Sequence, residues 1–171
     1  MNGFISGWYL LYTRPKQEKK VAIQLEEKEV DYFLPTIKIT RQWHDRKKVI
    51  DTPLFPSYVF VNIKTAYEFN NGLSIDGVSC YVRFGKQLAR VGQIVIDQIK
   101  LVIKRGKNIL VSEESFLPGK QLIIRQGALS GLSCEVVKYG GGERILVRVD
   151  LLQRNILLMI PSDNVAEAPK F

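Results

Sequence analysis

The sequence predicts an α+β protein in two parts: an N-terminal domain with an antiparallel sheet flanked by helices, and a small C-terminal β-barrel. Three observations lead to this prediction. Strand-like and helix-like segments alternate up to about residue 105, whereas every later segment is strand-like. The pair Pro118-Gly119, a combination typical of turns and loops, lies between the two patterns. With 171 residues, the chain is long enough for one medium domain or two small ones.

The N-terminal domain is predicted to begin with a strand and a helix. Gly7–Tyr12 reads G-W-Y-L-L-Y, an aromatic and aliphatic run typical of a buried strand. Thr13 is then expected to cap a helix from Pro15 to about Lys28, because threonine is favoured at the N-cap and proline in the first turn. Its apolar residues fall on one face, and these are Val21, Ala22 and Leu25.

A hairpin with a basic tip is predicted in the middle of this domain. Tyr32–Thr40 and Val49–Pro53 have strand character, and the polar stretch Arg41–Lys48 between them reads R-Q-W-H-D-R-K-K. Phe55–Ile63 follows with the strongly β-prone sequence F-P-S-Y-V-F-V-N-I. We therefore expect the hairpin to lead directly into a core strand.

Three further elements complete the predicted N-terminal domain. Thr65–Asn71 has the pattern of a short helix capped by Thr65 and ended by Gly72. Val78–Phe84 is strand-like. Gly92–Lys104 is helical, because its apolar residues share one face, and these are Ile99, Val102 and Ile103.

Short strands with glycine-rich turns account for the rest of the chain. The strands are predicted at Leu122–Arg125, Cys134–Tyr139, Arg144–Val149 and Ile156–Ile160, with turns at Gly127–Gly131 and Gly140–Gly142. Several short strands in so few residues indicate a small barrel, of about five strands. The predicted boundaries are residues 5–107 for the N-terminal domain, 108–116 for a linker and 117–168 for the barrel.

Charge is distributed unevenly between the two parts. Of the net charge of +8, all lies in residues 1–110, which have 18 Lys and Arg against 10 Asp and Glu, whereas the remainder has 7 of each. A one-sided basic balance favours nucleic acid or an acidic protein surface as partner, although solubility alone would also explain it. There is no run of about 18 apolar residues, and because the N-terminus lacks a basic region followed by an apolar stretch, no signal peptide is expected. We expect a cytoplasmic monomer without membrane contact, with Cys80 and Cys134 as reduced core residues.

Catalysis, a metal and a cofactor are not indicated by any motif. The one histidine, His44, lies in the predicted hairpin tip, where a lone side chain is more often a surface residue than a base. No cluster of His, Cys and Asp has metal-ligand spacing. The glycines Gly140–Gly142 are not followed by the Lys-Ser/Thr pair of a phosphate loop. We therefore predict a binding protein without cofactor rather than an enzyme.

Four segments carry a more specific signal. They are Trp8–Tyr12 with its basic helix, Pro53–Val61 (P-L-F-P-S-Y-V-F-V), Gly77–Gly85 (G-V-S-C-Y-V-R-F-G) and Gly119–Val136. In this order they resemble the NusG family of transcription elongation and antitermination factors, whose KOW motif is similar to the fourth segment. The second and third are nearest to RfaH and the capsular polysaccharide antiterminators. The resemblance implies a NusG-like N-terminal domain followed by an SH3-like KOW barrel, and a role in antitermination on particular operons such as surface polysaccharide clusters.

The resemblance also implies a site for RNA polymerase. In this family a hydrophobic pocket of the N-terminal domain binds the clamp helices of the largest polymerase subunit. The matching positions here are Tyr12, Phe55, Tyr58 and Phe60. Aromatic residues suit such a contact, although alternate residues of this strand would equally fill a core. A second contact segment of RfaH aligns with Glu68–Asn71, from which we take Asn70 and Asn71 as polymerase-binding candidates.

Basic residues on the predicted helix and hairpin tip are candidates for nucleic-acid contact. They would attract phosphates without regard to sequence, and the aromatic members could stack on an exposed non-template DNA strand. A solvated surface is the alternative interpretation. The candidates are Arg14, Lys16, Lys19, Lys20, Arg41, Trp43, His44, Arg46, Lys47 and Lys48.

The KOW-like segment leaves the C-terminal partner open. Its matching positions are Gly119, Gly127, Leu129, Gly131 and Val136. The motif usually has Pro-Phe where this chain has Ala128-Leu129, and a glycine where it has Cys134. A ribosomal protein, Rho or neither could be bound. An RNA- or ribosome-binding KOW protein of translation is the alternative function, although such proteins lack the N-terminal domain.

The C-terminal domain is predicted to be a barrel at all times. In RfaH the corresponding domain can instead form a helical hairpin that covers the polymerase site. Here Leu122–Arg125, Glu135–Lys138 and Ile145–Val149 are rich in Ile and Val, which favour strands. The three glycines Gly140–Gly142 would each cost about 1 kcal/mol inside a helix.

Overall fold

A computed structural model describes residues 5–43 and 46–105, and six strands of the second half at residues 110–112, 120–124, 133–139, 142–149, 154–158 and 165–167. The contacts between residues divide the chain into two compact units, Met1–Ile96 and Asp97–Phe171. Each unit is described separately below.

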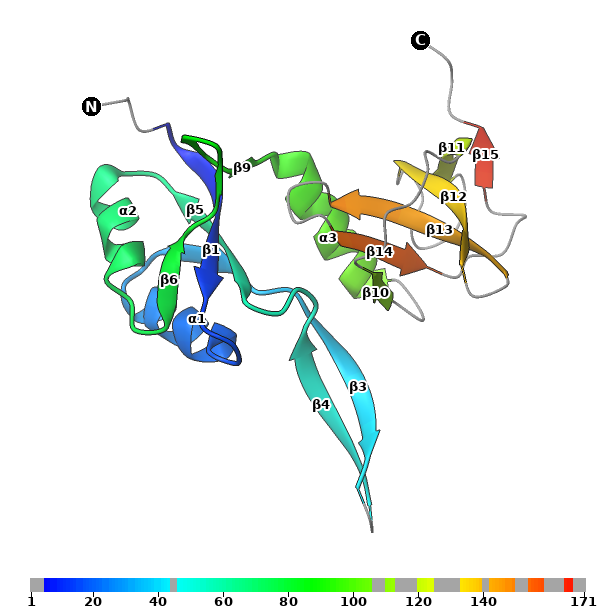
Figure 1. Cartoon of the computed structure of the whole chain (residues 1–171), viewed down its shortest axis with the longest axis horizontal. Coiled ribbons are helices and arrows are strands. Elements are labelled where there is room, and N and C mark those ends of the chain that lie inside the picture. Colours follow the sequence, from blue (N-terminus) through cyan, green and yellow to red (C-terminus); the bar gives the residue numbers. More distant parts are fainter. Residues whose placement is uncertain are drawn as a thin grey trace. The chain divides into compact units, whose positions relative to one another are not determined.

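An antiparallel sheet forms the centre of the first unit (Figure 1). Its middle strand is β1 (Gly7–Thr13), the aromatic run at the start of the chain. Strand β5 (Tyr58–Ile63) pairs with one edge of β1, with Leu10 opposite Phe60, and β2 (Asp31–Phe33) pairs with β5. Strand β6 (Val78–Tyr81) pairs with the other edge of β1. The predicted antiparallel sheet is therefore confirmed.

Two helices cover one face of this sheet. They are α1 (Glu18–Glu27) and α2 (Ala66–Leu73). The residues predicted for the apolar face of the first helix are all buried, and Val21 and Leu25 pack on inward-facing residues of the sheet. Burying a large aliphatic side chain contributes about 1.5–3 kcal/mol, so this layer is the main core of the unit. The cluster contains Tyr9, Leu11, Val21, Leu25, Val30, Val59, Val61, Ile63, Ile75 and Tyr81.

The start of α1 differs from the prediction. Thr13 does not cap the helix but ends strand β1, where its backbone N–H donates to the carbonyl of Ser57 at 2.8 Å. Lys16 then adopts a left-handed conformation with φ of 64°, which cannot belong to a right-handed helix. The helix consequently begins at Glu18, after Gln17, whose side chain makes no capping hydrogen bond.

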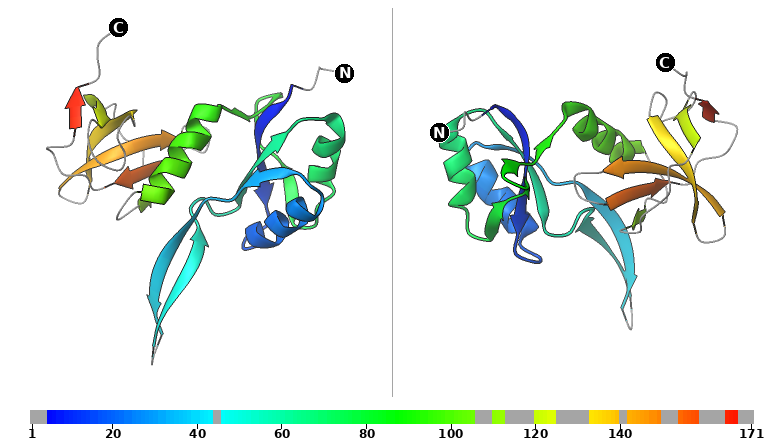
Figure 2. Two further views of the ribbon diagram at one scale, coloured as in Figure 1. Left: turned by 180° about the vertical axis from the view of Figure 1, so that it is seen from behind. Right: turned by 45° about the horizontal axis from the view of Figure 1, so that its top comes forward.

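The predicted hairpin is present and projects from the sheet as a two-stranded ribbon (Figures 1 and 2). It is formed by β3 (Thr36–Gln42) and β4 (Lys47–Pro53), with Ile39 opposite Ile50. The single predicted strand over Tyr32–Thr40 is wrong: it is split into β2 and β3, which belong to different sheets. The split falls at Leu34 and Pro35, in agreement with the inability of proline to donate a sheet hydrogen bond.

Helix α2 confirms one end of its prediction and corrects the other. The hydroxyl of Thr65 caps the helix by accepting from the N–H of Glu68 at 3.1 Å. Gly72 does not end the helix but lies inside it and is buried. A Cβ atom at Gly72 would lie 2.3 Å from the hydroxyl oxygen of Tyr81, so this glycine allows the helix to approach the sheet closely.

Small strands and a third helix follow β6. The strand predicted over Val78–Phe84 is interrupted at Val82. Beyond it, β7 (Arg83–Phe84) pairs with β8 (Gln87–Leu88), and β9 (Arg90–Val91) returns to pair with β1. Helix α3 (Gln93–Arg105) corresponds to the predicted third helix; its first residues belong to the first unit and the rest to the second.

The described part of the second unit beyond α3 is entirely β-structure. One antiparallel sheet has the order β10-β14-β13-β12-β11-β15. The four predicted strand regions are confirmed, although Arg125, Met159 and Ile160 lie outside the described residues. The strands are β10 (Leu110–Ser112), β11 (Lys120–Ile124), β12 (Ser133–Tyr139), β13 (Gly142–Val149), β14 (Arg154–Leu158) and β15 (Val165–Glu167). Closure of the sheet into an SH3-like barrel, the linker at 108–116 and the two domain boundaries stay predictions. Among the described helices, none is long and apolar enough to cross a membrane.

Candidate binding surfaces

Strand β1 sends alternate side chains to opposite faces of the central sheet. Tyr9 and Leu11 face the layer beneath α1 and α2. Their neighbours Leu10 and Tyr12 consequently face the other side, because successive side chains of a strand point in opposite directions. Leu10 is fully buried, whereas Tyr12 is 40% exposed. This second face is therefore filled near the middle of the strand and open near its end.

Two tyrosines lie side by side at this open end. Tyr12 and Tyr58 are directly opposite each other in the pairing of β1 with β5. Their ring centroids are 5.4 Å apart and the rings are tilted by 57°. Aromatic pairs at such a separation attract each other beyond the area they bury. The pair thus presents a broad aromatic surface of fixed orientation.

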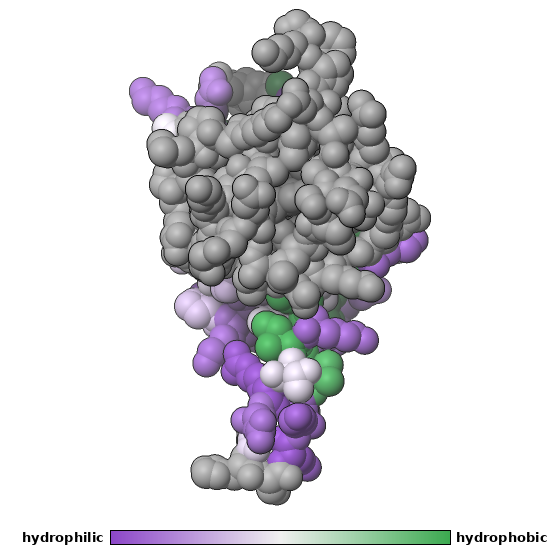
Figure 3. Space-filling view, turned by 90° about the vertical axis from the view of Figure 1, so that its right-hand side faces the viewer, coloured by the Kyte–Doolittle hydropathy of each residue, from purple (hydrophilic) through white to green (hydrophobic). Residues whose placement is uncertain are grey.

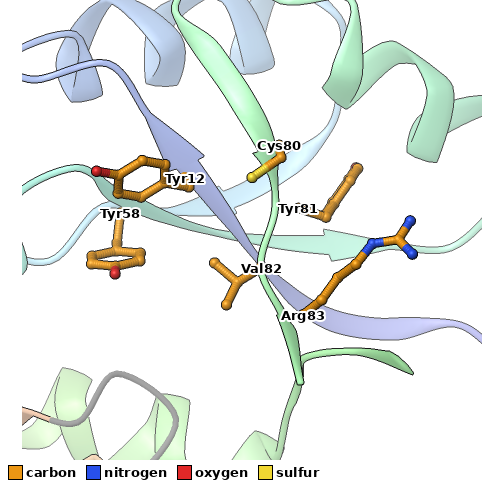
Figure 4. A pocket seen from close by; sticks show the side chains of 6 residues that line it. All are labelled: Tyr12, Tyr58, Cys80, Tyr81, Val82 and Arg83. Atoms are coloured by element: carbon orange, nitrogen blue, oxygen red, sulfur yellow. The ribbon is translucent and has the colours of Figure 1, made fainter. Parts of the chain in front are cut away.

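A shallow depression adjoins the tyrosine pair (Figure 4). Its volume is about 430 Å³, and its lining is mostly apolar. Figure 4 shows Tyr12, Tyr58 and Val82 around the open space, with the side chain of Arg83 extending at one side. The lining residues are Tyr12, Tyr58, Cys80, Tyr81, Val82 and Arg83. An aromatic and aliphatic hollow next to a cation can receive an apolar side chain of a protein partner.

The other two predicted aromatic residues lie beneath this surface. Phe55 and Phe60 have no exposed area, and their ring centroids are 6.1 Å apart at an angle of 72°. Phe33 packs on Phe60 from strand β2, with centroids 5.9 Å apart. The structure therefore brings Tyr12 and Tyr58 together at the surface and uses Phe55 and Phe60 as support.

Sequence reasoning did not identify the β6 side of the depression. Cys80 was expected in the core, but it is exposed and has no disulfide partner among the described residues. Its neighbour Tyr81 takes the inward position, so Cys80 and Val82 face the opposite side of the sheet. The alternation of V-S-C-Y-V could have indicated this, once Tyr81 was recognised as the residue that packs under α2.

The segment aligned with the second polymerase contact of RfaH is only partly available for binding. Glu68 accepts a hydrogen bond from the N–H of Lys64 at 2.7 Å, and Phe69 stacks on Tyr81 with centroids 4.3 Å apart. Asn70 is exposed and Asn71 half-buried, and neither lines the depression. Tyr67, next to them on α2, is 75% exposed.

Cations are concentrated toward the tip of the β3–β4 hairpin. Arg41 stands directly opposite Lys48, and Lys47 opposite Gln42. Like charges in directly opposite positions destabilise a β-ribbon unless an anion lies between them. No ion pair involves a hairpin cation in the part of the chain that the structure describes. Figure 3 shows hydrophilic residues over much of the hairpin, at the bottom of the view, with an apolar patch nearer the body.

An exposed aromatic residue accompanies these cations. Trp43 is 58% exposed, and its backbone N–H donates to the carbonyl of Arg46 at 2.9 Å, which closes the tip. A flat, exposed ring next to basic side chains is the combination that binds single-stranded nucleic acid by stacking and charge. His44 lies outside the described residues.

The cations near α1 have a different environment. Arg14 and Lys20 form ion pairs with Asp76, at 3.7 and 2.6 Å. Lys19 donates to the backbone carbonyl of Asp51 at 2.7 Å and so connects α1 with the hairpin. The predicted basic residues therefore form two groups. One is on the hairpin and has no ion pairs among the described residues. The other, called the α1 cations below, lies just before and within the first turn of α1, where Arg14, Lys19 and Lys20 are engaged.

The KOW-like positions are only partly described. Val136 lies in β12, opposite Lys120 and Ile145. The other four, Gly119, Gly127, Leu129 and Gly131, are outside the described residues. No group of three or more His, Cys, Asp or Glu residues that could hold a metal occurs among the residues that the structure describes.

These features define a class of protein with a mixed α/β first unit, an aromatic depression on its sheet and a basic hairpin. Comparison with known proteins agrees with this class. The model of a family described as "Transcription termination factor nusG" matches residues 6–100, more than half of the chain. The protein therefore belongs to the NusG family, whose members are transcription termination and antitermination factors and not enzymes.

Two relatives extend the comparison over nearly the whole chain. The transcription termination/antitermination protein NusG of Lactococcus lactis subsp. lactis is 24% identical over 165 residues, covering 88% of this chain and 87% of the relative. A structure titled "Domain interaction in Thermotoga maritima NusG" is similar with a TM-score of 0.55 and 21% identity, covering 96% of this chain and 98% of that one. The second similarity shows a shared fold.

Proposed function

We propose that this protein is an antitermination factor that docks on the clamp helices of RNA polymerase through the depression beside Tyr12 and Tyr58. Factors of the NusG family bind RNA polymerase, and the proposal adds the surface and the polymerase element. The observation that carries it is the pairing of Tyr12 with Tyr58 beside the depression. Two large aromatic side chains are held in register at the open end of one sheet face, where Tyr12 is 40% exposed and Tyr58 is half-buried.

The physical case for docking rests on preorganisation. The backbones of β1 and β5 fix the two rings, and Phe55 and Phe60 beneath them have no exposed area through which they could shift. Rings that are already ordered lose little conformational entropy on binding. Aromatic anchors of this kind typically carry much of the energy of an interface. Arg83 at the edge adds a charge that would favour an acidic group on the partner helix.

The proposal is tested by binding to core RNA polymerase and to a fragment that contains only the clamp helices. Tyr58→Ala should raise the Kd by about thirtyfold, which corresponds to a loss of about 2 kcal/mol. Tyr67→Ala is the matched control, because it removes an exposed tyrosine outside the depression. Equal Kd values for wild type and a folded Tyr58→Ala variant would show that the depression is not the docking surface.

We further propose that the β3–β4 hairpin contacts nucleic acid in the elongation complex. Arg41, Lys47 and Lys48 are placed on the strands of the ribbon, and Trp43 stands at its tip. This arrangement offers charge for phosphates and a ring for stacking, as an exposed non-template strand requires. The sequences of the segments around Tyr58 and Arg83 resemble those of the polysaccharide antiterminators. This resemblance favours a role on particular operons over a role in general elongation.

Charge reversal at the hairpin separates nucleic-acid contact from protein contact. Replacing Arg46, Lys47 and Lys48 by Glu should weaken binding to a complete elongation scaffold but not to polymerase without nucleic acid. Loss of three phosphate contacts should lower the slope of log affinity against log salt by about 2. The change in affinity between 50 and 200 mM salt then becomes roughly twentyfold smaller. An equal loss with and without nucleic acid would identify the hairpin as a protein contact instead.

A further inference from the structure

One acidic residue lies among the cations that were predicted to bind nucleic acid. The Asp76 carboxylate is 2.6 Å from the Lys20 ammonium and 3.7 Å from the Arg14 guanidinium. The hydrogen bond and charge of Lys20, with a smaller effect of Arg14, hold the pKa of Asp76 below its ordinary value. The carboxylate is therefore ionised at neutral pH and cancels one of the two positive charges beside it.

The position of Asp76 is fixed by contacts that do not involve its charge. Its backbone carbonyl accepts from the side-chain amide of Gln24 at 3.0 Å, and its N–H donates to the amide oxygen of Gln24 at 3.3 Å. Gly77 follows with φ of 96°, and a Cβ there would lie 3.2 Å from side-chain atoms of Gln17 and Val21. The loop is thus pressed against α1 by a glycine and an amide, and the carboxylate is held where the two cations converge.

Stability does not account for this arrangement. All three side chains are more than half exposed, and ion pairs between exposed groups contribute little to folding. Their effect on a polyanionic ligand is larger, because each cation that neutralises a phosphate adds a salt-dependent increment to affinity. A carboxylate between Arg14 and Lys20 takes the place that a phosphate would occupy.

We infer that Asp76 is a specificity-determining residue that weakens binding of arbitrary nucleic acid by competing with phosphate for Arg14 and Lys20. The inference rests on the proposed contact between the β3–β4 hairpin and nucleic acid. The hairpin cations are available at all times, whereas the α1 cations engage only when a nucleic acid already held by the hairpin brings a phosphate to displace the carboxylate. A nucleic acid that makes a short nonspecific contact then binds the hairpin cations alone. A correctly positioned strand binds both the hairpin cations and the pair Arg14 and Lys20.

The test is the salt dependence of binding to a single-stranded DNA oligonucleotide of mixed sequence, measured by fluorescence anisotropy with the full-length protein. Asp76→Asn keeps both backbone contacts to Gln24 and frees the two cations. The slope of log Kd against log salt should increase by about 0.7 for each additional phosphate contact, so by up to about 1.4. For each protein, the ratio of the affinity at 50 mM salt to the affinity at 200 mM salt can be compared. This ratio should be about three- to sevenfold larger for Asp76→Asn than for wild type.

Two control variants distinguish a local effect from a change in total charge. Glu27→Gln removes one negative charge from α1, at an exposed position that forms no ion pair among the described residues. Asp31→Asn frees Lys64, with which it pairs at 2.5 Å, at another place on the first unit. Both should leave the slope within about 0.2 of wild type, since neither adds a phosphate contact. A slope for Asp76→Asn that equals those of the controls would overturn the inference.

The hairpin variant keeps this test separate from the proposed function. If reversing Arg46, Lys47 and Lys48 lowers DNA affinity but Asp76→Asn leaves the slope unchanged, the hairpin contact stands and the competition by Asp76 is wrong. If the hairpin variant binds DNA as wild type does while Asp76→Asn increases the slope, the hairpin contact and the proposed order of engagement are wrong, but the competition of Asp76 with phosphate stands. Circular dichroism of each variant confirms that the fold is retained.

Discussion

Tyr81 and Tyr58 occupy the same sheet on opposite faces and have opposite environments. Tyr81 is 3% exposed, stacks on Phe69 with an angle of 9° between the rings, and donates its hydroxyl proton to the carbonyl of Phe69 at 3.1 Å. Tyr58 is half-buried, with Tyr12 as its ring partner at the edge of the depression. The comparison shows that the amino acid alone does not decide between core and contact surface. Whether a tyrosine is a core or a surface residue depends on the face of the sheet on which it lies and on the elements that cover that face.

The packing of α1 and α2 on one face of the sheet explains why the other face can leave Tyr12 and Tyr58 uncovered. Helices α1 and α2 bury the larger cluster, so folding does not depend on covering Tyr12 and Tyr58. Phe55, Phe60 and Leu10 fill the second face only as far as the tyrosine pair. A surface of large aromatic side chains can therefore be kept for a partner without loss of the fold.

The largest expected difference between the two faces concerns stability. Tyr81→Ala should lower the free energy of unfolding of the first unit by about 3–5 kcal/mol, as for other buried aromatic residues. Tyr58→Ala should lower it by less than about 1.5 kcal/mol, because its ring is partly in solvent already. Urea unfolding followed by Trp8 fluorescence measures both, in a Trp43→Phe background that leaves one tryptophan. Equal losses would mean that Tyr58 is as much a core residue as Tyr81.

The second prediction concerns the close approach of α2 to Tyr81. Gly72→Ala places a Cβ 2.3 Å from the Tyr81 hydroxyl oxygen, and the ring is held by Phe69 and cannot move freely. Overpacking costs about 1–3 kcal/mol, against a gain of about 1 kcal/mol in helix propensity. We expect a net loss of about 1 kcal/mol. In a Tyr81→Phe background the nearest ring atom would be Cζ, at 3.2 Å, so the same substitution should cost clearly less. Equal effects in the two backgrounds would show that the hydroxyl is not the obstacle.

Local patterns were sufficient to predict most of the first unit. The 3.6-residue spacing of Val21, Ala22 and Leu25 identified the buried face of α1, although not the start of the helix, and the Thr65 cap is confirmed. The period of two along Y-V-F-V identified the core strand β5. These features depend on residues that are neighbours in the chain, and such information is contained in a single sequence.

Features that depend on distant residues could not be predicted in this way. Phe55 was grouped with Tyr58 as part of one strand, but Ser57 has φ of 67° and the strand begins only after it. Helix α1 begins late because the backbone N–H of Arg14 donates to Gly77, far along the chain. The pairing of Arg14 and Lys20 with Asp76 likewise requires the fold, so the basic patch looked more available in the sequence than it is.

The smallest expected effect comes from the ionisation of Tyr81. Burial, with lesser contributions from Tyr9 and Glu68, raises the pKa of Tyr81 well above its ordinary value of about 10. A raised pKa means that the folded protein keeps a proton which the unfolded chain loses. The stabilising contribution is thus complete below about pH 10 and is lost as the pH rises further toward the folded-state pKa.

The measurement is the difference in urea midpoint between wild type and Tyr81→Phe from about pH 8 to 11, a window chosen about the ordinary tyrosine pKa. All other ionisable groups are common to both proteins, so their effects cancel in the difference. Tyr81→Phe lacks the ionisable group, so wild type should lose stability more steeply above about pH 10. Parallel curves for wild type and Tyr81→Phe would mean that the Tyr81 hydroxyl reaches solvent in the folded protein, and that the two faces differ less than their packing indicates.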